Sequence, residues 1–594
     1  MKIAAWFVYL NIVGLLAVAI WFRCRDLANI PGVNGDEAWY GVQAELILHG
    51  RPIAWRTPTG NLLNPLFFGP QLLLHALCEP SFALLRTTAV ASGLAALAVN
   101  FWLCRSVFGR RVALISTTIL AVLPISIVYS RLAWDASQSL LITLPAIYLP
   151  LRAIIDAPRK VRWSACGLAA LTAAIIVHPT NLFVAPIVGV CLALAWRDAM
   201  STISRRLLGK LGFSIAAIGF VAAGAAAGSY SPAVLGRFTN PTEYAAFGVN
   251  LGRLFSGATV YDYVSGAVAP AKDGMFPSEV ILYDLPTSIA FCSLAWGIYR
   301  LLRRGSGFRD GSADNAEHLV NSHDWINRRK IAVTGLTVGW GLSLAAFFLV
   351  AGPAAIAPHF ERYGICLIGA GAILAALSVD WWLDRPAGGR VAATTIAVAT
   401  GWLLLAVCHA SFFNFMETSG GRSHPTFRTA AIEPKEAAFD FIVGHSKKPG
   451  SDVRVLTSEW WNYWPLRYLS FGEQRAPESP KIVVEQYTEL PNFISSDSYR
   501  GNRTWIVEFA ESPACEAVRR WGRTCPAQIE VTTILDFSGQ PLLCIFRVGA
   551  TVEADQSFNA EPSATAITRR AVADGFGLKG GDRPWTAMQK LQKN

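Results

Sequence analysis

Charged residues are scarce in this sequence of 594 residues: Asp, Glu, Lys and Arg make up 16% of it, and hydrophobic residues make up 53%. Soluble globular proteins carry about a quarter of their residues as charged side chains, so the composition excludes a soluble protein. The sequence also lacks a Cys/His metal box, a glycine-rich phosphate loop and a nucleophile elbow in its strand–turn–helix context. The sequence therefore gives no support to the classes of soluble enzyme that these three motifs define.

Apolar runs of bilayer length recur along the first two thirds of the chain, which predicts a polytopic α-helical membrane protein. The first run, residues 3–22, is longer than a signal-peptide core and is not followed by a small-residue cleavage site, so we interpret it as a retained span. Eleven spans are predicted in all: 3–22, 84–104, 112–128, 138–155, 164–177, 182–196, 211–228, 281–302, 331–351, 363–382 and 391–410.

Lys and Arg gather in every second connection between these spans. The five clusters are Arg105/Arg110/Arg111, Arg159/Lys160/Arg162, Arg197/Arg205/Arg206/Lys210, Arg303/Arg304/Arg309/Arg328/Arg329/Lys330 and Arg385/Arg390. Because cytoplasmic loops carry an excess of Lys and Arg, this pattern predicts a cytoplasmic N-terminus and places everything after about residue 411 outside. The same pattern accounts for the net charge of +11, so nucleic-acid binding is not predicted.

The composition changes after about residue 411, where charged residues, Pro and Gly become frequent. Helical patterns at 434–446 and 460–470 alternate with strand patterns at 453–456, 481–485, 504–509, 531–537 and 542–548. We predict a transmembrane domain over 1–410, a small α/β domain over 411–549 and a disordered tail over 550–594. Cys515 and Cys525 flank a helical stretch; an outside location would permit a disulfide between them, and two free thiols are the alternative.

An acidic pair follows the first span. Asp36 and Glu37 precede Trp39 and Tyr40, two residue types that suit the headgroup zone of a bilayer. A carboxylate near the membrane is costly unless it is paired, hydrated or bound to a ligand. This motif therefore predicts functional carboxylates, and a solvated first loop is the alternative.

Three more polar clusters fall on the same predicted side of the membrane. They are Arg131 with Asp135, His178 in a His-Pro-Thr-Asn turn, and His359 with Glu361, Arg362 and Tyr363. Arg131 and Asp135 could instead be an ordinary (i, i+4) helical pair. Glu361 and Arg362 could be a surface ion pair. His178 could be a loop or capping residue, because it lacks any metal-ligand spacing.

The order, spacing and shared side of these motifs resemble the GT-C membrane glycosyltransferases. The closest group is the lipid A aminoarabinose transferases, protein O-mannosyltransferases and rhizobial galacturonic acid transferases, over about residues 1–410. The resemblance implies that Asp36 is catalytic, with Glu37 beside it and Asp135 as the second-loop acid. It also implies that Arg362 and Tyr363 lie near the donor phosphate, with His178, His359 and Glu361 as further candidates.

One departure from this family concerns the donor phosphate. Many members carry Lys-Pro-Pro-Leu after the first loop, where this chain has Asn64-Pro65-Leu66. Because Asn64 has no charge, phosphate binding would fall more heavily on the basic candidates, which are Arg51, Arg56, Arg131 and Arg362.

The resemblance implies transfer of a hexose or pentose, with inversion, from a polyprenyl-phosphate donor to a lipopolysaccharide, lipid, glycan or protein acceptor. It implies the outer face of a bacterial cytoplasmic membrane, with the α/β domain in the periplasm. Asp36 would act as general base, and a Mg²⁺ or Mn²⁺ ion held by Asp36 or Asp135 could neutralise the leaving phosphate. A transporter or flippase of a lipid-linked or anionic substrate is the alternative, although no inverted hydropathy repeat supports it; a non-catalytic scaffold is a third.

Overall fold

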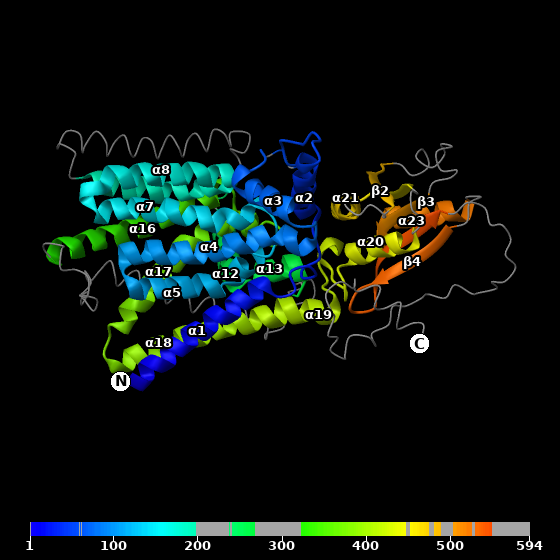
Figure 1. Cartoon of the computed structure of the whole chain (residues 1–594). Helices are drawn as coiled ribbons and strands as arrows, with labels where there is room; N and C mark the ends of the chain where they lie inside the picture. Colours follow the sequence, from blue (N-terminus) through cyan, green and yellow to red (C-terminus); the bar gives the residue numbers. More distant parts are fainter. Residues whose placement is uncertain are drawn as a thin grey trace. The chain divides into compact units, whose positions relative to one another are not determined.

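The computed structural model describes residues 2–58, 60, 62–197, 237, 240–267, 322–446, 452–474, 480–488, 503–524 and 529–548. These residues form long helices and one five-stranded sheet (Figure 1). They fall into two compact units, each considered by itself. The helical unit lies within Met1–Arg25, Ala89–Tyr263 and Val268–Ala410, and the mixed unit lies within Asp26–Thr88, Val264–Ala267 and Ser411–Asn594.

The helical unit contains most of the apolar helices. Its α-helices are α1 (Lys2–Cys24), most of α4 (Phe82–Phe108), α5 (Arg110–Val122), α6 (Pro124–Tyr129), α7 (Ser139–Ile155), α8 (Lys160–Val177), α9 (Ala185–Trp196), α12 (Pro241–Ser256), α13 (Ala258–Val260), α16 (Ser322–Val350), α17 (Ile365–Leu383) and α18 (Ala387–Cys408). Short turns separate them: η1 (Asp135–Gln138), η2 (Ala157–Arg159), η3 (Pro179–Val184), η9 (Pro353–Ile356) and η10 (Glu361–Gly364). Two π-helical segments, η6 (Tyr261–Ser265) and η11 (His409–Asn414), run across its boundary with the mixed unit.

Eight helical stretches of the described chain are long and apolar enough to cross a membrane. They are Trp6–Cys24, Phe82–Phe108, Asp135–Ile155, Ala157–Val177, Pro179–Trp196, Trp325–Val350, Glu361–Leu383 and Gly388–Ser419. Each overlaps one predicted span, so the polytopic helical class is confirmed. The predicted spans 211–228 and 281–302 lie outside the described residues, and the total of eleven spans, together with their orientation, stays a prediction.

The predicted span 112–128 is wrong as one continuous helix. Helix α5 ends at Val122, and α6 begins at Pro124 and runs only to Tyr129. Leu123 between them is extended, with φ −62° and ψ 123°. The cause is local, because proline has no N–H to donate and pushes the residue before it out of the helical region.

Small residues and polar pairs hold the helices of this unit together. A Cβ atom built on Gly339 in α16 would lie 2.6 Å from the Cα atom of Ile187 in α9, so these two helices approach closely only because the position is glycine. Helices α1 and α18 run side by side (Figure 1), and the Trp402 indole N–H donates to the Asn11 side-chain oxygen at 3.0 Å. Such contacts replace the hydrophobic driving force that is lacking between helices in lipid.

The mixed unit joins the first loop region to the α/β domain. Its elements are α2 (Gly35–Leu48), α3 (Pro65–Leu77), α19 (Phe415–Ser419), η12 (Pro425–Phe427), α20 (Pro434–His445), β1 (Asp452–Thr457), α21 (Trp460–Gln474), β2 (Lys481–Gln486), β3 (Arg503–Phe509), α23 (Pro513–Thr524), β4 (Ile529–Leu535) and β5 (Pro541–Val548). The predicted α/β domain is confirmed.

The sheet of the mixed unit has the strand order β2-β1-β3-β5-β4. Strands β1, β2 and β3 are parallel, whereas β5 pairs antiparallel with both β3 and β4. One apolar core joins α20 and α21 to the sheet and includes Phe439, Leu466 and Trp505. A second, smaller core on Ile506 and Phe546 includes residues of α23.

Helices α2 and α3 pack against α21 within the mixed unit. A Cβ atom at Gly41 in α2 would lie 2.6 Å from the Tyr468 ring, and the Tyr468 hydroxyl lies 2.8 Å from Nε2 of His75 in α3. Because of these contacts, residues 26–88 belong to the same compact unit as the residues after 411. The domain division at residue 410 stays a prediction.

Candidate active site

The acidic pair opens helix α2. Asn34 is the N-cap, and its side-chain oxygen accepts the Asp36 N–H at 2.8 Å, while Glu37 Oε1 accepts the Asn34 N–H at 3.0 Å. This is a capping box, and acidic side chains in the first turn also suit the positive end of the helix dipole. Asp36 is half-buried and Glu37 is fully buried, so the solvated-loop alternative does not hold for Glu37.

Glu37 forms a buried ion pair with Arg86 in the second turn of α4. The Arg86 Nε and Nη2 atoms donate to the two Glu37 oxygens, each at 2.8 Å, and both side chains are fully buried. Arg86 was missed by the sequence analysis, although an arginine inside an apolar run is itself a signal for a buried partner. Glu37 therefore anchors the loop, and its predicted catalytic role stays untested.

A second buried carboxylate, that of Glu433, binds the backbone of the loop that leads to Asp36. Glu433 Oε1 accepts the Val33 N–H at 3.1 Å and the Lys435 ammonium at 2.6 Å, and the Glu433 N–H donates to the Asn29 side chain at 3.0 Å. Lys435 and Glu433 are both buried. The backbone before Asp36 is thus fixed by side chains that lie far away in the sequence.

The remaining candidates of the mixed unit are basic or neutral. Arg51 and Arg56 are exposed, and Arg56 donates to the Gly60 carbonyl at 2.9 Å. Asn64 is buried and caps α3, because its side-chain oxygen accepts the Leu66 N–H at 3.0 Å. The capping contact gives Asn64 a structural role at the position where the family carries lysine.

In the helical unit, Arg362 lies among aromatic rings. Its guanidinium carbon is 5.6 Å from the Trp134 ring centroid and 4.9 Å from that of Tyr363. It donates to the His359 carbonyl at 3.2 Å and to the Tyr363 hydroxyl at 3.3 Å. Within the described residues, no Asp or Glu oxygen forms an ion pair with this guanidinium, so its charge is available to an anion.

Asp135 follows Trp134, whose ring centroid is 5.6 Å from the Arg362 guanidinium carbon, and its Oδ1 accepts the Ala136 N–H at 2.8 Å. The structure thus brings together Asp135 and Arg362, which are far apart in the sequence. Arg131 is fully buried and donates to the Phe22 carbonyl at 2.6 Å. Because α6 ends at Tyr129 and η1 begins at Asp135, Arg131 and Asp135 do not share a helix, and the (i, i+4) alternative is wrong.

Glu361 is not a surface residue. It is fully buried, and its Oε1 accepts the Tyr129 hydroxyl at 2.8 Å. The alternative of a surface pair with Arg362 is therefore wrong, and Tyr129 is a partner that sequence reasoning missed. His359 is exposed and has φ 78°, a conformation that L side chains rarely adopt, and its ring lies 4.8 Å from that of Tyr263.

His178 is a capping residue, as its alternative interpretation proposed. Its Nδ1 accepts the Thr180 N–H at 3.3 Å, and its ring centroid is 5.7 Å from that of Tyr363. Burial, aided by the charge of Arg362, lowers the pKa of His178 to about 4. The imidazole is therefore neutral at pH 7, and it sits against the aromatic wall of the Arg362 site.

Asp262 is not among the residues that the sequence analysis proposed for the site. It lies in the π-helical segment η6, a type of distortion that is frequent at functional sites. Burial raises the pKa of Asp262 to about 6, against the opposing effect of Arg253, and the Asp262 charge acts on Glu361. Asp262 is therefore a further acidic group near Glu361, the residue before Arg362.

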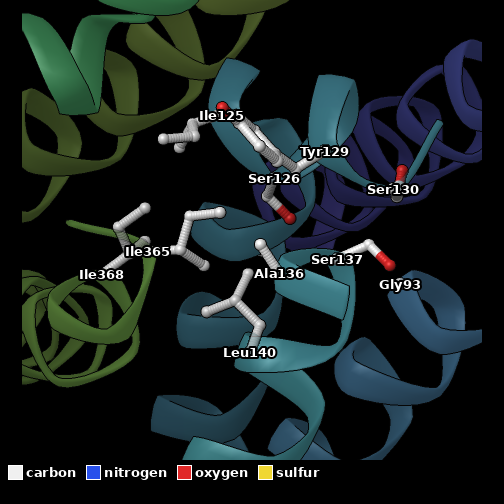
Figure 2. Close-up of a pocket in the computed structure, with 10 residues that line it drawn as sticks. All are labelled: Gly93, Ile125, Ser126, Tyr129, Ser130, Ala136, Ser137, Leu140, Ile365 and Ile368. Atoms are coloured by element: carbon white, nitrogen blue, oxygen red, sulfur yellow. The ribbon is translucent and has the colours of Figure 1, made fainter. Parts of the chain in front are cut away.

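A small cavity lies behind these residues in the helical unit. Tyr129 and the serines 126, 130 and 137 supply its polar lining, and Figure 2 shows Ala136 and Ile365 on its apolar walls. It has room for about 10 Å³, which is space for about one water molecule. A sugar does not fit there, so this cavity is not the substrate site.

The described residues do not assemble a metal centre: no three His, Cys, Asp or Glu side chains gather there as ligands. Asp36 and Asp135, the two predicted ligands, belong to different compact units. The Mg²⁺ or Mn²⁺ ion stays a prediction.

No protein-family model and no curated protein matches the sequence. The structure is similar to that of ArnT from Cupriavidus metallidurans in the apo state, with 14% identity, coverage of 92% of this chain and 98% of that chain, and a TM-score of 0.47. For the same protein bound to undecaprenyl phosphate, the values are 15%, 91%, 98% and 0.45. For the apo oligosaccharyltransferase of Archaeoglobus fulgidus they are 13%, 85%, 70% and 0.45.

At these identities and TM-scores the likeness supports no assignment of function, which has to come from the residues of the site.

The titration of His178 gives a testable pH dependence. Between pH 6.5 and about 4 the unfolded chain binds a proton at His178 that the folded chain does not bind, so stability falls as the pH falls through this window. We expect a loss of about 2 kcal/mol by about pH 5 from this group. Thermal melts of detergent-solubilised protein at several pH values measure it.

The control for this pH dependence is His178→Asn, which keeps an N-cap acceptor but cannot titrate. Its stability should fall less than that of the wild type over the same pH range. Equal losses in both proteins would show that His178 does not carry the effect.

Proposed function

We propose that this protein is a membrane glycosyltransferase that moves a sugar from a polyprenyl-phosphate donor to an envelope acceptor. The observation that carries the proposal is the Arg362 guanidinium, which is held between Trp134 and Tyr363 and forms no ion pair with a described carboxylate. Arginine binds phosphate through paired, charge-assisted hydrogen bonds. Its position at the start of a candidate span, Glu361–Leu383, suits a phosphate whose lipid tail lies in the membrane.

In this proposal Asp36 is the general base. It takes the proton of the acceptor hydroxyl as that oxygen attacks the anomeric carbon, and the bond from this carbon to the phosphate oxygen breaks. The electron pair leaves with the lipid phosphate, where Arg362 stabilises the negative charge. Attack opposite the leaving group inverts the anomeric centre.

Other site residues support these two roles. In this proposal Asp135, near Arg362, orients acceptor hydroxyls, and the neutral His178 and Tyr363 lie beside the phosphate, with their rings 5.7 Å apart. Arg51, Arg56 and Arg131 stay as proposed further contacts of the donor. The acceptor is a lipopolysaccharide, lipid, glycan or protein at the outer face of a bacterial cytoplasmic membrane, with the C-terminal domain on that side.

The test uses purified protein in lipid vesicles with a labelled polyprenyl-phosphate sugar and extracted envelope lipids or glycans. Appearance of free lipid phosphate together with labelled acceptor supports the enzyme. Movement of intact donor from one leaflet to the other, without cleavage, would instead identify a flippase. If the protein neither transfers the sugar nor moves the donor between leaflets, both functions are excluded.

Replacing Arg362 by glutamine should raise the KM for the donor about tenfold or more, because a charged partner of the phosphate is lost. The maximal rate should change less, since Arg362 contacts the donor in the ground state too. Initial rates over a range of donor concentrations measure both quantities.

The matched control is Arg385→Gln. Arg385 also stacks on an aromatic ring, with its guanidinium carbon 3.9 Å from the Trp381 centroid, but it follows the other end of α17. It should leave the KM unchanged. Equal effects of both variants would mean that aromatic packing, and not phosphate binding, is what Arg362 provides.

A further inference from the structure

Two cysteines of the mixed unit are buried against each other. Cys515 lies in the first turn of α23, and Cys544 lies in the middle of β5. Both are fully buried and belong to one apolar cluster, which also contains Ile506, Val518 and Phe546. The cluster covers the face of the sheet on which α23 packs.

The register of the sheet fixes the position of Cys544. It lies between Glu508 of β3 and Thr533 of β4 as a paired residue on both sides, so it is held in the interior of the sheet. Its thiol lies in the same buried cluster as that of Cys515, each thiol shifts the pKa of the other, and both are free in this structure. One helical turn after Cys515, Arg519 donates from Nη2 to the Cys544 sulfur at 3.2 Å.

The contacts also set the reactivity of the pair. Hydrogen bonds from the Cys515 thiol and from Arg519 lower the pKa of the Cys544 thiol to about 6, although burial opposes this shift. The same contact, together with burial, raises the pKa of Cys515. Cys544 is therefore the thiol that ionises first and is the better nucleophile near neutral pH.

The sequence offers Cys525 as an alternative disulfide partner for Cys515. Cys525 follows the last residue of α23, Thr524, and lies outside the described residues. Cys515 is in the first turn of that same helix, with the rest of α23 between it and Cys525. The described neighbour of the Cys515 thiol is Cys544, which is more distant in sequence than Cys525.

We propose that Cys515 and Cys544 form a disulfide in the mature protein, which ties α23 to the interior strand β5. The proposal rests on the predicted location of this domain outside the cytoplasm, where disulfides form and persist. It does not depend on the glycosyl transfer proposed above.

The oxidant is the disulfide of a thiol–disulfide oxidoreductase. The Cys544 thiolate attacks this disulfide, which gives a mixed disulfide and releases one oxidoreductase thiolate. The Cys515 thiolate then attacks the Cys544 sulfur and displaces the second oxidoreductase thiolate. Two protein thiols are oxidised, one disulfide is reduced to a dithiol, and the two thiol protons pass to the released thiolates. Because both sulfurs are buried in the folded domain, the reaction takes place when α23 already lies against β5 but the cluster is still open to the oxidoreductase.

The first test maps the three thiols in the full-length protein. Cells are denatured with acid, the precipitate is dissolved in denaturant at neutral pH with N-ethylmaleimide, and the purified chain is digested without reduction for mass spectrometry. We expect a linked peptide pair that contains Cys515 and Cys544, with Cys525 alkylated. A Cys515–Cys525 link, or three alkylated thiols, would overturn the proposal.

Two variants act as controls. Cys525→Ser should keep the linked pair, whereas Cys515→Ser should abolish it and leave Cys544 alkylated. Loss of the link in Cys525→Ser with retention of the fold would overturn the assignment of the partner.

A second test examines the choice of Cys544 as the partner of Cys515 independently of the location of this domain outside the cytoplasm. Protein that is reduced, partly unfolded and refolded with oxidised glutathione should form the same Cys515–Cys544 link. Refolded protein that carries glutathione adducts or another link would show that the pairing is wrong. The correct link in this test, with three free thiols in cells, would overturn the outside location and with it the disulfide of the mature protein. None of these results depends on the transfer assay.

Discussion

Replacing Arg86 by methionine will lower the free energy of unfolding of the detergent-solubilised protein by about 3–5 kcal/mol. The fully buried Glu37 carboxylate would lose both of its guanidinium donors, each now at 2.8 Å. The carbonyl groups of Leu27, Pro31 and Gly32 would lose their Arg86 donors as well. Equilibrium or thermal unfolding followed by circular dichroism measures the loss.

A double variant shows whether the buried charge is the cause. Glu37→Gln removes the charge but keeps a side-chain acceptor for the capping box, in which Gln is also accepted. Arg86→Met combined with Glu37→Gln should therefore be more stable than Arg86→Met alone. The reason is that an uncompensated charge costs more in a buried site than a neutral amide does.

The control for this series is Arg105→Met. Arg105 is exposed and lies in the last turn of the same helix α4, so its loss should change stability by about 0.5 kcal/mol or less. An Arg86→Met protein that melts like Arg105→Met would show that Glu37 is hydrated and not held by a buried pair.

The sequence predicts the spans well because the signal for a span is local. The bilayer sets the length of each apolar run, so α1, α7 and α17 follow from run length alone. The elements after residue 411 are predictable for a similar reason, since each helix or strand has its own periodicity. The strand order β2-β1-β3-β5-β4 was not predicted, because pairing between strands depends on contacts that no local pattern encodes.

The roles within the candidate site are not local, and there the sequence is less informative. In the sequence Asp36 and Glu37 are equivalent, because they are neighbouring acids. The ion pair between Glu37 and Arg86, which lies in another helix, distinguishes their roles. In the same way, the sequence suggests that Glu361 is a surface residue beside Arg362. The structure shows instead that Glu361 is completely buried and accepts a hydrogen bond from the Tyr129 hydroxyl. Residue type and order indicate a site, whereas partners far along the chain decide which carboxylate is structural.

Replacing Asp36 by asparagine should reduce the turnover of sugar transfer by about a hundredfold or more, because the general base is lost. The amide keeps the size of the side chain and fits the first turn of α2, where the Asn34 cap and the Glu37–Arg86 pair persist. The neutral side chain is also less costly near lipid, so folding and membrane insertion should be unchanged. Single-turnover rates with saturating labelled donor, together with a thermal melt, measure both properties.

Asp26→Asn is the matched control, because Asp26 is an exposed acid in the same first loop. Asp26 has φ 44°, a left-handed conformation that asparagine tolerates, so this variant should keep both fold and rate. Asp135→Asn should lower the rate less than Asp36→Asn does, since Asp135 is proposed to orient the acceptor and not to take its proton. A well-folded Asp36→Asn protein that transfers sugar as fast as Asp26→Asn would exclude Asp36 as the base. The base would then have to be sought among the acids near Arg362, first at Asp135 and then at Asp262.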